Sequence, residues 1–482
     1  MTTNSDVPVG RPDADDSTSG PPDGRVVTRS RSRAVVTGLV TVLSMACIVL
    51  AWLTGGVGAL ASVVAVAALS AWRPVRRGTP RDHLVRTVGG GAISAFAAWT
   101  LVSVLVAVVP DNGDRVASRL ATWARDHRLG AVIDQLESWT YSEPPSATPA
   151  TDLAVTPVVT APTTTAPATT TEPTTTSEGD TTTTSGEPTT TLPPTPAPPA
   201  PLTPVIEPAL AGEGQWSVVA TAAGEPAMWA TGFRPIADTG GIVATMVVVD
   251  QTHLRTALFN GSEMPGGGGW TRGNRVPDVL QPALIGAMNG GFRFDHMKGG
   301  YVTEGRVMKP LRDGDATLAI DADGVLSMGQ LGRDIVDDGS WVSLRQNLEL
   351  IVDDGRSRVD EAVANGVWWG ADHGNAVYVK RSAVCTIADG RIAYVMAAMV
   401  DAHQLAATLI AMGCVMAMQM DINVDWPTFM TYTHDAEGMA EPHWVDERMS
   451  GNPRRYLDGS SKEFFAFFDP TLVPGDALAL LT

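Results

Sequence analysis

Three long apolar runs stand near the start of the chain. Residues 34–53, 55–72 and 88–109 contain no charged side chain. A helix needs roughly 20 apolar residues to cross the hydrocarbon core of a bilayer, so the pattern predicts three transmembrane helices within residues 34–110. A cleaved signal peptide explains the pattern poorly, because two further apolar runs follow the first one.

The placement of arginines predicts how these helices are oriented. Two groups flank the runs: Arg25, Arg29, Arg31 and Arg33 before the first, and Arg73, Arg76, Arg77, Arg81 and Arg86 between the second and the third. Cytoplasmic loops collect basic residues, so we expect residues 1–33 to form a disordered cytoplasmic tail and the C-terminal domain to be extracytoplasmic. The expected location is the cell membrane, multi-pass. Because the runs hold no ionisable residue, they are interpreted as an anchor.

Residues 111–143 show a helical spacing of apolar side chains. The apolar positions are Val116, Leu120, Trp123, Val132, Leu136 and Trp139. This spacing predicts an amphipathic stalk helix that lies on the membrane or pairs with a partner. A short helix packed against the rest of the chain fits the pattern equally well.

The next segment, 144–207, has the composition of a linker. It contains 22 Thr and 15 Pro, with no aromatic residue and no Lys or Arg. Such a segment cannot bury enough apolar surface to fold. We therefore expect a disordered, extended Thr/Pro linker that reaches at most about 200 Å, at about 3.1 Å per residue.

Short apolar runs alternate with turn signals beyond residue 208. The expected strands are 242–249, 254–258, 284–288, 316–320, 348–352, 376–379, 383–387, 392–399, 414–420 and 463–468. Asp-Gly pairs at 313–314, 323–324, 354–355 and 389–390 favour hairpins. The expected fold class is α+β, with a β-rich, mixed-sheet extracytoplasmic domain over 208–482.

One helix, over 402–412, is predicted strongly by its ends. Asp401 is a good N-cap, Gln404 completes a capping box, and Gly413 suits the C-terminal end. The apolar run that follows ends at Asp421. A carboxylate at the end of a buried strand is costly unless it is paired, hydrogen-bonded or open to solvent, so Asp421 is the acid that most strongly suggests a function.

Charge and cysteine content narrow the classes of partner. Residues 208–482 contain 34 Asp and Glu against 20 Lys and Arg, a net charge of −14, which excludes a nucleic-acid partner. Cys47 lies in an apolar run, whereas Cys385 and Cys414 lie in the C-terminal domain. Outside the cytoplasm these two could form a disulfide, and two buried thiols are the equally consistent alternative.

Two stretches of the C-terminal domain carry a family resemblance. The stretch 284–294 (LIGAMNGGFRF) holds Asn289-Gly290-Gly291-Phe292. The stretch 380–423 holds Arg381, an Asp-Gly turn, a helix and a strand that ends at Asp421. Together these elements resemble the phosphodiester glycosidase family, which includes the enzyme that removes N-acetylglucosamine from the mannose-phosphate signal. Four Lys beside thirty Arg also suggest a bacterial, actinobacterial member.

The resemblance implies roles for individual residues. Asp421, Arg381 and Asn289 are the expected catalytic residues, as acid/base or nucleophile, phosphate ligand and hydrogen-bond donor. The expected substrate-binding residues are Gly290, Gly291, Arg293, Asn423, His296 and His434. From the residue types alone, a structural Asp421–Arg381 ion pair and an ordinary Asn-Gly-Gly turn are the favoured alternative, and only the resemblance makes the catalytic roles equally plausible.

Two departures from the family pattern affect the prediction. Arg293 stands where the family has a second Phe, and residues 421–425 (Asp-Ile-Asn-Val-Asp) replace a Gly-rich loop that follows the terminal Asp. Side chains in that loop would hinder a close approach of the backbone to phosphate. No cofactor is expected. The alternating Asp421, Asn423 and Asp425 lack the Gly and Glu of an EF-hand, although a looser calcium site stays open as an alternative.

The sequence thus favours a membrane-anchored, extracytoplasmic hydrolase that cleaves a sugar–phosphodiester linkage in a cell-envelope glycan. The expected partner is this glycan or another phosphate-linked saccharide. A non-catalytic glycan-binding or scaffolding module with the same fold is the alternative hypothesis.

Overall fold

The computed structural model describes residues 99–109, 116–141, 143–155, 196–366, 369 and 377–481. The chain divides into two compact units, Met1–Val109 and Pro110–Thr482. In the described part of the chain, no helix is long and apolar enough to cross a membrane. The predicted spans 34–53 and 55–72 lie outside the described residues, and the third is described only from residue 99, where it is helical.

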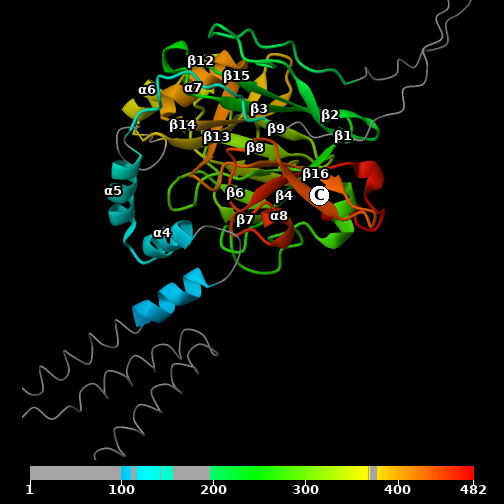
Figure 1. The fold of residues 1–482 in the computed structure, drawn as a ribbon. Coiled ribbons are helices and arrows are strands. Elements are labelled where there is room, and N and C mark those ends of the chain that lie inside the picture. The colour runs from blue at the N-terminus through cyan, green and yellow to red at the C-terminus, as the bar shows by residue number, and fades with distance from the viewer. Residues whose placement is uncertain are drawn as a thin grey trace, which may run out of the picture. The chain divides into compact units, whose positions relative to one another are not determined.

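The second unit is built around an eight-stranded sheet (Figure 1). Its strand order is β1-β2-β3-β14-β13-β15-β11-β12. The strands are β1 (Ser217–Ala222), β2 (Glu225–Phe233), β3 (Ala244–Val249), β11 (Val352–Asp353), β12 (Arg356–Ser357), β13 (Val379–Ile387), β14 (Ile392–Val400) and β15 (Cys414–Ile422).

Two five-stranded sheets complete the β-structure of the described residues, with orders β7-β6-β10-β8-β9 and β17-β16-β5-β18-β4. The first contains β6 (Tyr301–Thr303), β7 (Arg306–Lys309), β8 (Ala316–Ile320), β9 (Leu326–Gln330) and β10 (Ser343–Gln346). The second contains β4 (Arg255–Phe259), β5 (Leu284–Asn289), β16 (Phe429–His434), β17 (Ala440–Trp444) and β18 (Phe464–Phe468).

Helices are few beside this β-structure. They are α4 (Val116–Asp126), α5 (Gly130–Thr140), α6 (Val359–Ala364), α7 (Ala402–Ala411) and α8 (Arg455–Asp458), with short 3-10 turns at Ala237–Thr239, Asp278–Ala283, Pro470–Leu472 and Leu478–Leu480. The predicted β-rich α+β class is confirmed. The capping box of α7 forms as predicted, because Gln404 N–H donates to the Asp401 carboxylate at 2.7 Å and the Gln404 side chain accepts from Asp401 N–H.

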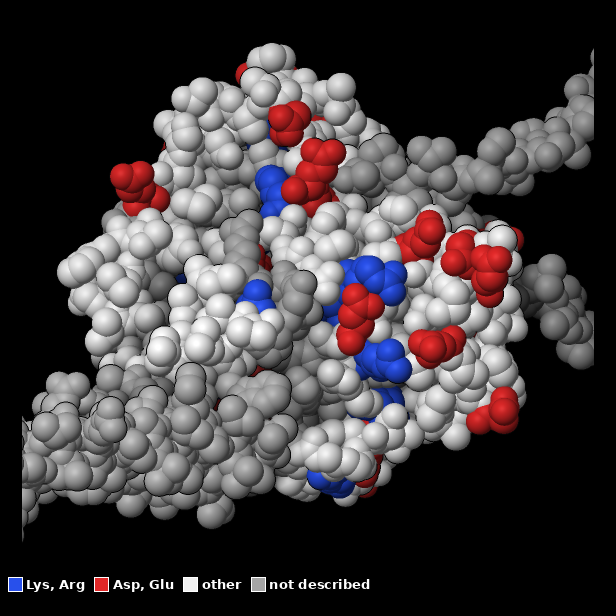
Figure 2. All heavy atoms as spheres, turned by 60° about the horizontal axis from the view of Figure 1, so that its bottom comes forward, with Lys and Arg blue, Asp and Glu red and all other residues white. Residues whose placement is uncertain are grey.

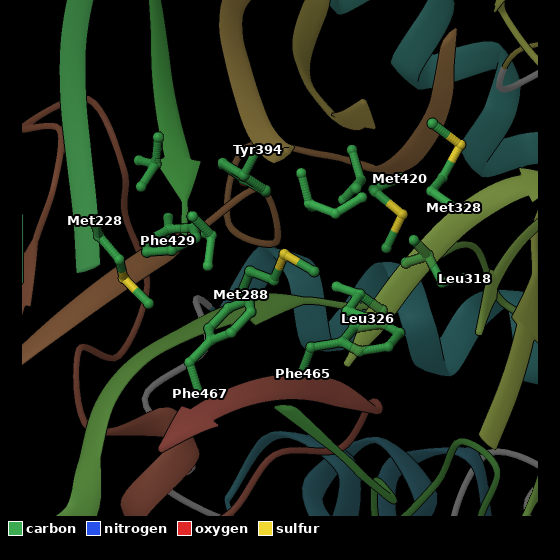
Figure 3. Packing of buried hydrophobic residues seen from close by; sticks show 14 of the residues in the cluster. Met228, Met288, Leu318, Leu326, Met328, Tyr394, Met420, Phe429, Phe465 and Phe467 are labelled. Carbon is green, nitrogen blue, oxygen red and sulfur yellow. The ribbon is translucent and has the colours of Figure 1, made fainter. Parts of the chain in front are cut away.

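Alternating side chains of the large sheet fill two separate cores. On β14, Tyr394 and Met396 face the layer shared with the five-stranded sheets, whereas Ala393 and Val395 face α7. This is the period-two pattern of a strand buried on both faces. Figure 3 shows the first of these cores, where side chains such as Met288 of β5 pack with aromatic rings from β16 and β18.

The prediction of a mixed sheet is wrong for the described strands, since every pair in the three sheets is antiparallel. Hairpin turns at three of the predicted Asp-Gly pairs, 323–324, 354–355 and 389–390, join neighbouring strands. Helix α7 makes a crossover from β14 to β15, but β13 lies between these two strands and pairs with both.

Several predicted strand boundaries also change. Val379, the last residue of the run 376–379, and the run 383–387 belong to a single strand, β13, and the run 348–352 contributes only its last residue to β11. Strands β1 and β2, which were not predicted, form one edge of the large sheet. Ala, Gly and Pro interrupt the β-branched pattern in these two strands, which removes the usual signal for a strand.

Segments on both sides of residues 156–195 make hydrogen bonds to the second unit. Ala150 N–H donates to Gly240 O at 2.9 Å, and Gly241 N–H donates to Ser146 O at 3.2 Å. On the other side of the Thr/Pro region, Arg391 Nη1 donates to Ala197 O at 2.7 Å. Both flanks of residues 156–195 are therefore bound to the same unit.

Cys385 and Cys414 are joined by a disulfide, with 5.7 Å between their Cα atoms. The bond links β13 to β15 inside the core beneath α7. It closes the segment that contains β14 and α7, and so it cross-links the two strands that lead into the region around Asp421.

We expect the double substitution Cys385→Ala and Cys414→Ala to lower the free energy of unfolding by about 3 kcal/mol, because the unfolded chain regains the freedom of a loop with a sequence separation of 29. Thermal unfolding followed by tryptophan fluorescence should show a lower Tm for the variant than for the parent protein. Added reductant should lower the Tm of the parent protein but not that of the variant. Equal Tm values for parent and variant would contradict a stabilising bond. Cys47→Ala is the control.

Candidate functional site

The ends of several strands meet at one edge of the second unit, around Asn289. Its amide nitrogen donates to Gly290 O at 2.8 Å and to Ser382 Oγ at 3.1 Å. Its oxygen accepts from Tyr394 Oη at 2.9 Å and from Thr428 N–H at 3.0 Å. Because these four bonds use the full capacity of the amide, Asn289 joins β5, β13, β14 and the start of β16 instead of facing a substrate.

A β-bulge in β15 sets the position of Asp421. Ala383 lies opposite Gln419, and Arg381 lies opposite Ile422. Two steps along β13 thus match three along β15, so β15 carries an extra residue between Gln419 and Ile422. Bulges of this kind re-aim neighbouring side chains and are common beside functional sites.

Asp421 forms an ion pair with Lys462. Lys462 Nζ lies 2.5 Å from Oδ2, and the N–H of Ile422 donates to Oδ1 at 2.9 Å. The side chains of Asp421 and Lys462 are 6 % and 14 % exposed. The pair is therefore mostly desolvated, although neither side chain is fully buried. This carboxylate and ammonium form the centre of the candidate site.

Trp426 packs beside this pair. Lys462 Nζ lies 4.4 Å from the centre of the Trp426 ring, and Arg455 Cζ lies 4.2 Å from it. Cations are attracted to the face of an indole ring, and the attraction grows as they lose water. Trp426 therefore helps to fix the Lys462 side chain next to Asp421.

The Asn-Gly-Gly turn is bound to Glu463. The N–H of Gly290 donates to Glu463 O at 3.2 Å, and the N–H of Gly291 donates to Glu463 Oε1 at 3.0 Å. A Cβ at Gly290 would lie 2.4 Å from Glu463 Oε1. Both amides, which were predicted to bind the substrate, thus donate to Glu463 in this structure, and glycine is required at position 290 so that Glu463 can approach.

A buried ion pair holds Glu463 in place. Arg345 Nη2 lies 2.6 Å from Glu463 Oε1, and both side chains are fully buried. Burial raises the pKa of the Glu463 carboxyl, and the charge of Arg345 counteracts this only in part. Among the described residues, Glu463 Oε2 has no hydrogen-bond partner.

Arg381 does not reach Asp421, contrary to the predicted phosphate ligand and to the alternative of an Asp421–Arg381 ion pair. Its guanidinium donates to Val400 O at 2.9 Å, to Val377 O at 3.0 Å and to Trp369 O. Burial lowers the pKa of Arg381 to about 10. Arg381 points to the α7 side of the sheet, where it also donates to Gln419 Oε1 at 3.2 Å.

Arg293 and His296 lie on the loop that follows the Asn-Gly-Gly turn. Arg293 Nη2 donates to the Asp126 carboxylate of α4 at 2.6 Å, and Arg293 Nε donates to Asp295 at 3.2 Å. Burial lowers the pKa of His296, and the charges of Arg125, Arg293 and Lys462 lower it further against the opposing effect of Asp295. The structure thus brings His296 into the electrostatic range of Lys462.

Asn423 and Asp425 shape the loop after Asp421. Asn423 Oδ1 accepts from the N–H of Asp425 at 3.1 Å. The Asp425 carboxylate accepts from Ser118 Oγ of α4 at 2.6 Å and from Ser450 Oγ at 3.3 Å. Within the described residues, no three His, Cys, Asp or Glu side chains gather in a way that could hold a metal ion.

His434 lies away from the site. It is the last residue of β16, whereas the site lies at the start of that strand, and its Nε2 contacts Gln281 O at 3.0 Å. A position 13 residues after Asp421 in sequence suggested proximity, but the turn at 423–428 and the length of β16 carry His434 to the far end of the sheet.

Lys462, Glu463 and Arg345 were not predicted as site residues. Lys462 and Glu463 directly precede the apolar run that forms β18. Lysine is rare in this chain, with only four residues, and a Lys-Glu pair at the start of a buried strand was the available signal. Arg345 gave no such signal, because its pairing with Glu463 joins two sheets across 118 residues.

Residues 283–421 match the model of the phosphodiester glycosidase family. The match begins just before β5 and ends at Asp421, and it therefore covers the turn, β13, α7 and β15. It leaves Lys462 and Glu463 outside. None of the curated proteins matches the chain.

Three solved structures show a distant similarity. The zebrafish N-acetylglucosamine-1-phosphodiester α-N-acetylglucosaminidase catalytic domain, auto-inhibited by its pro-peptide, has 17 % identity and a TM-score of 0.35 over 52 % of this chain and 87 % of that chain. A hypothetical protein from Synechocystis has 10 % identity and a TM-score of 0.34, over 52 % and 64 %. A putative exported protein from Burkholderia pseudomallei has 13 % identity and a TM-score of 0.27, over 48 % and 75 %.

We expect Gly290→Ala to disrupt the candidate site, because the added Cβ would collide with the Glu463 carboxylate and carbonyl. Overpacking of this kind costs roughly 1–3 kcal/mol, and unfolding in urea should show the loss. The matched control is Gly273→Ala, where nothing lies within 4 Å of the new Cβ. Equal stability of the two variants would mean that the contact with Glu463 is not tight.

Proposed function

We propose that the second unit is a hydrolase that cleaves a sugar–phosphodiester linkage in a cell-envelope glycan. The Asp421–Lys462 pair is the observation that carries this proposal, because it presents an acid and a cation together at a partly accessible strand end. The match of residues 283–421 to the phosphodiester glycosidase family supports it.

The two charges of the pair suit the two halves of such a substrate. Cleavage of a sugar–phosphate bond builds positive charge on the sugar and leaves an anionic phosphate. The Asp421 carboxylate would stabilise or attack the sugar carbon, and Lys462 would bind the phosphate as a point charge. Cation–π contact with Trp426 holds Lys462 near that position in the absence of substrate.

His296 is the candidate base for water. Its side chain is 44 % exposed, so it can meet a substrate. Because the pKa of His296 lies below its usual 6.5, the ring is neutral at pH 7 and can accept a proton. Protonation at low pH would prevent His296 from accepting a proton from water. We therefore expect the turnover rate to fall as the pH is lowered through the pKa of His296.

We propose that this unit works outside the cytoplasm and is anchored in the cell membrane by the apolar runs within residues 34–110. The arginine distribution supports the orientation. The Cys385–Cys414 disulfide supports an oxidising compartment.

A glycan-binding module without turnover is the second candidate. The saturated hydrogen bonds of Asn289 and the occupied amides of Gly290 and Gly291 favour it, since those groups offer no free donor to a transition state. On the face shown in Figure 2, basic side chains lie next to acidic ones without a broad patch of one sign.

We expect Asp421→Asn to slow the release of reducing sugar from a panel of sugar phosphodiesters and envelope polysaccharide. The rate should fall roughly 10²–10⁴-fold, as it does when a catalytic acid or base is removed. The control is Asp389→Asn, which changes an exposed ion pair in the β13–β14 hairpin. Retention of polysaccharide by the folded parent protein without any turnover would favour the binding module instead.

Lys462→Met should weaken substrate binding and turnover together, because it keeps the length of the side chain but removes the ammonium that pairs with Asp421. Steady-state kinetics on the same substrates would show KM rising and kcat falling. Lys298→Met is the control, since no contact between Lys298 and either Asp421 or Lys462 is found among the described residues. Unchanged kinetics in Lys462→Met would exclude Lys462 from the phosphate-binding role.

A further inference from the structure

Helix α5 presents a stripe of exposed apolar side chains. Leu129, Val132, Leu136 and Trp139 are 44 %, 55 %, 49 % and 69 % exposed. Their spacing of three, four and three residues places them within about 80° of arc on one face, at 100° per residue. No described side chain of α5 is buried. We call these four residues the α5 stripe.

Contacts at both ends of the helical pair fix the direction of the stripe. On α4, Asp126 binds Arg293 at 2.6 Å and Ser118 binds Asp425 at 2.6 Å. Directly after α5, Tyr141 O accepts from the N–H of Tyr378 at 2.9 Å. The stripe is thus held outward from the second unit and cannot turn inward without breaking these contacts.

The position of the stripe in the chain points to what covers it. The uncharged run 88–109 ends seven residues before α4. Seven peptide steps span at most about 25 Å, and an eleven-residue helix adds about 16 Å. Four further steps from Asp126 to Gly130 add at most about 14 Å, so the start of α5 lies within about 55 Å of the end of that run along the chain. The described end of the run also exposes large apolar side chains, among them Leu101 and Val109.

Charge around the stripe favours an uncharged lipid surface. Residues 114–140 contain four Arg, at 115, 119, 125 and 128, and four acids, at 114, 126, 134 and 137, so their formal charge is zero. Residues 208–482 carry −14, which opposes binding to an anionic surface. Trp139 is the most exposed residue of the stripe, and tryptophan prefers the interface between lipid and water.

We propose that the α5 stripe lies in the interfacial layer of the bilayer that holds the apolar runs. This inference rests on the proposed membrane anchoring. It is independent of the proposed hydrolase activity.

The test uses the full chain in phosphatidylcholine nanodiscs, with an NBD fluorophore on single cysteines and doxyl-labelled lipid as quencher. Cys47 of the parent protein reports on anchoring, because the other two cysteines form the disulfide. Val132→Cys and Leu136→Cys, each with Cys47→Ala, report on the stripe. Val336→Cys with Cys47→Ala is the matched control, since Val336 is 60 % exposed on the β-structure.

We expect the lipid to quench labels at 47, 132 and 136 but not at 336, and Trp139→Ser to reduce quenching at 132. Quenching at 47 without quenching at 132 or 136 would overturn the proposal while leaving the anchor intact. Absence of quenching at 47 would overturn the anchor and the proposal together. The label at 132 could instead be shielded from water without being quenched by the lipid. If this shielding increases with the number of chains per disc, a second copy of the chain covers the stripe, and that result also overturns the proposal.

Discussion

The ion pair between Glu463 and Arg345 supports the arrangement of the candidate site. It joins the five-stranded sheets, and through Glu463 it binds both amides of the Asn-Gly-Gly turn. Gly290 O in turn accepts from the N–H of Asp421 at 3.3 Å. Removing one partner of a buried ion pair typically costs about 3–5 kcal/mol, because the other charge stays buried without compensation. Burial of the two charges is unfavourable by itself, but the pair fixes the positions of four strand ends relative to one another.

The sequence was informative where local signals decide the structure. The capping residues of α7, the Asp-Gly hairpins and the apolar runs of β5, β14 and β15 were predictable, because each depends on neighbours in the chain. The prominence of Asp421 was also predictable, since a carboxylate at the end of an apolar strand needs a partner. These features, with the Asn-Gly-Gly turn, gave the resemblance to the family whose model matches residues 283–421.

Partners that come from distant parts of the chain were not predictable. Arg381 precedes an apolar strand as the family pattern requires, yet the pleat of β13 sends its guanidinium toward α7. Asp421 turns the other way because of one extra residue in β15, and no composition rule signals such a bulge. Lys462 then supplies the cation that had been assigned to Arg381. One residue of register thus decides which basic side chain meets the acid.

The attachment of both flanks of residues 156–195 to one unit has a consequence for how this region can vary. Its ends are fixed by contacts such as Ala154 O with Glu447 N–H and Ala197 O with Arg391. The entropy lost when the two ends of a segment are fixed grows only with the logarithm of the segment's length, about 0.6 kcal/mol for each doubling. Insertions or deletions of Thr/Pro repeats would therefore change the stability of the unit only slightly. Related chains are free to differ widely in the length of this region.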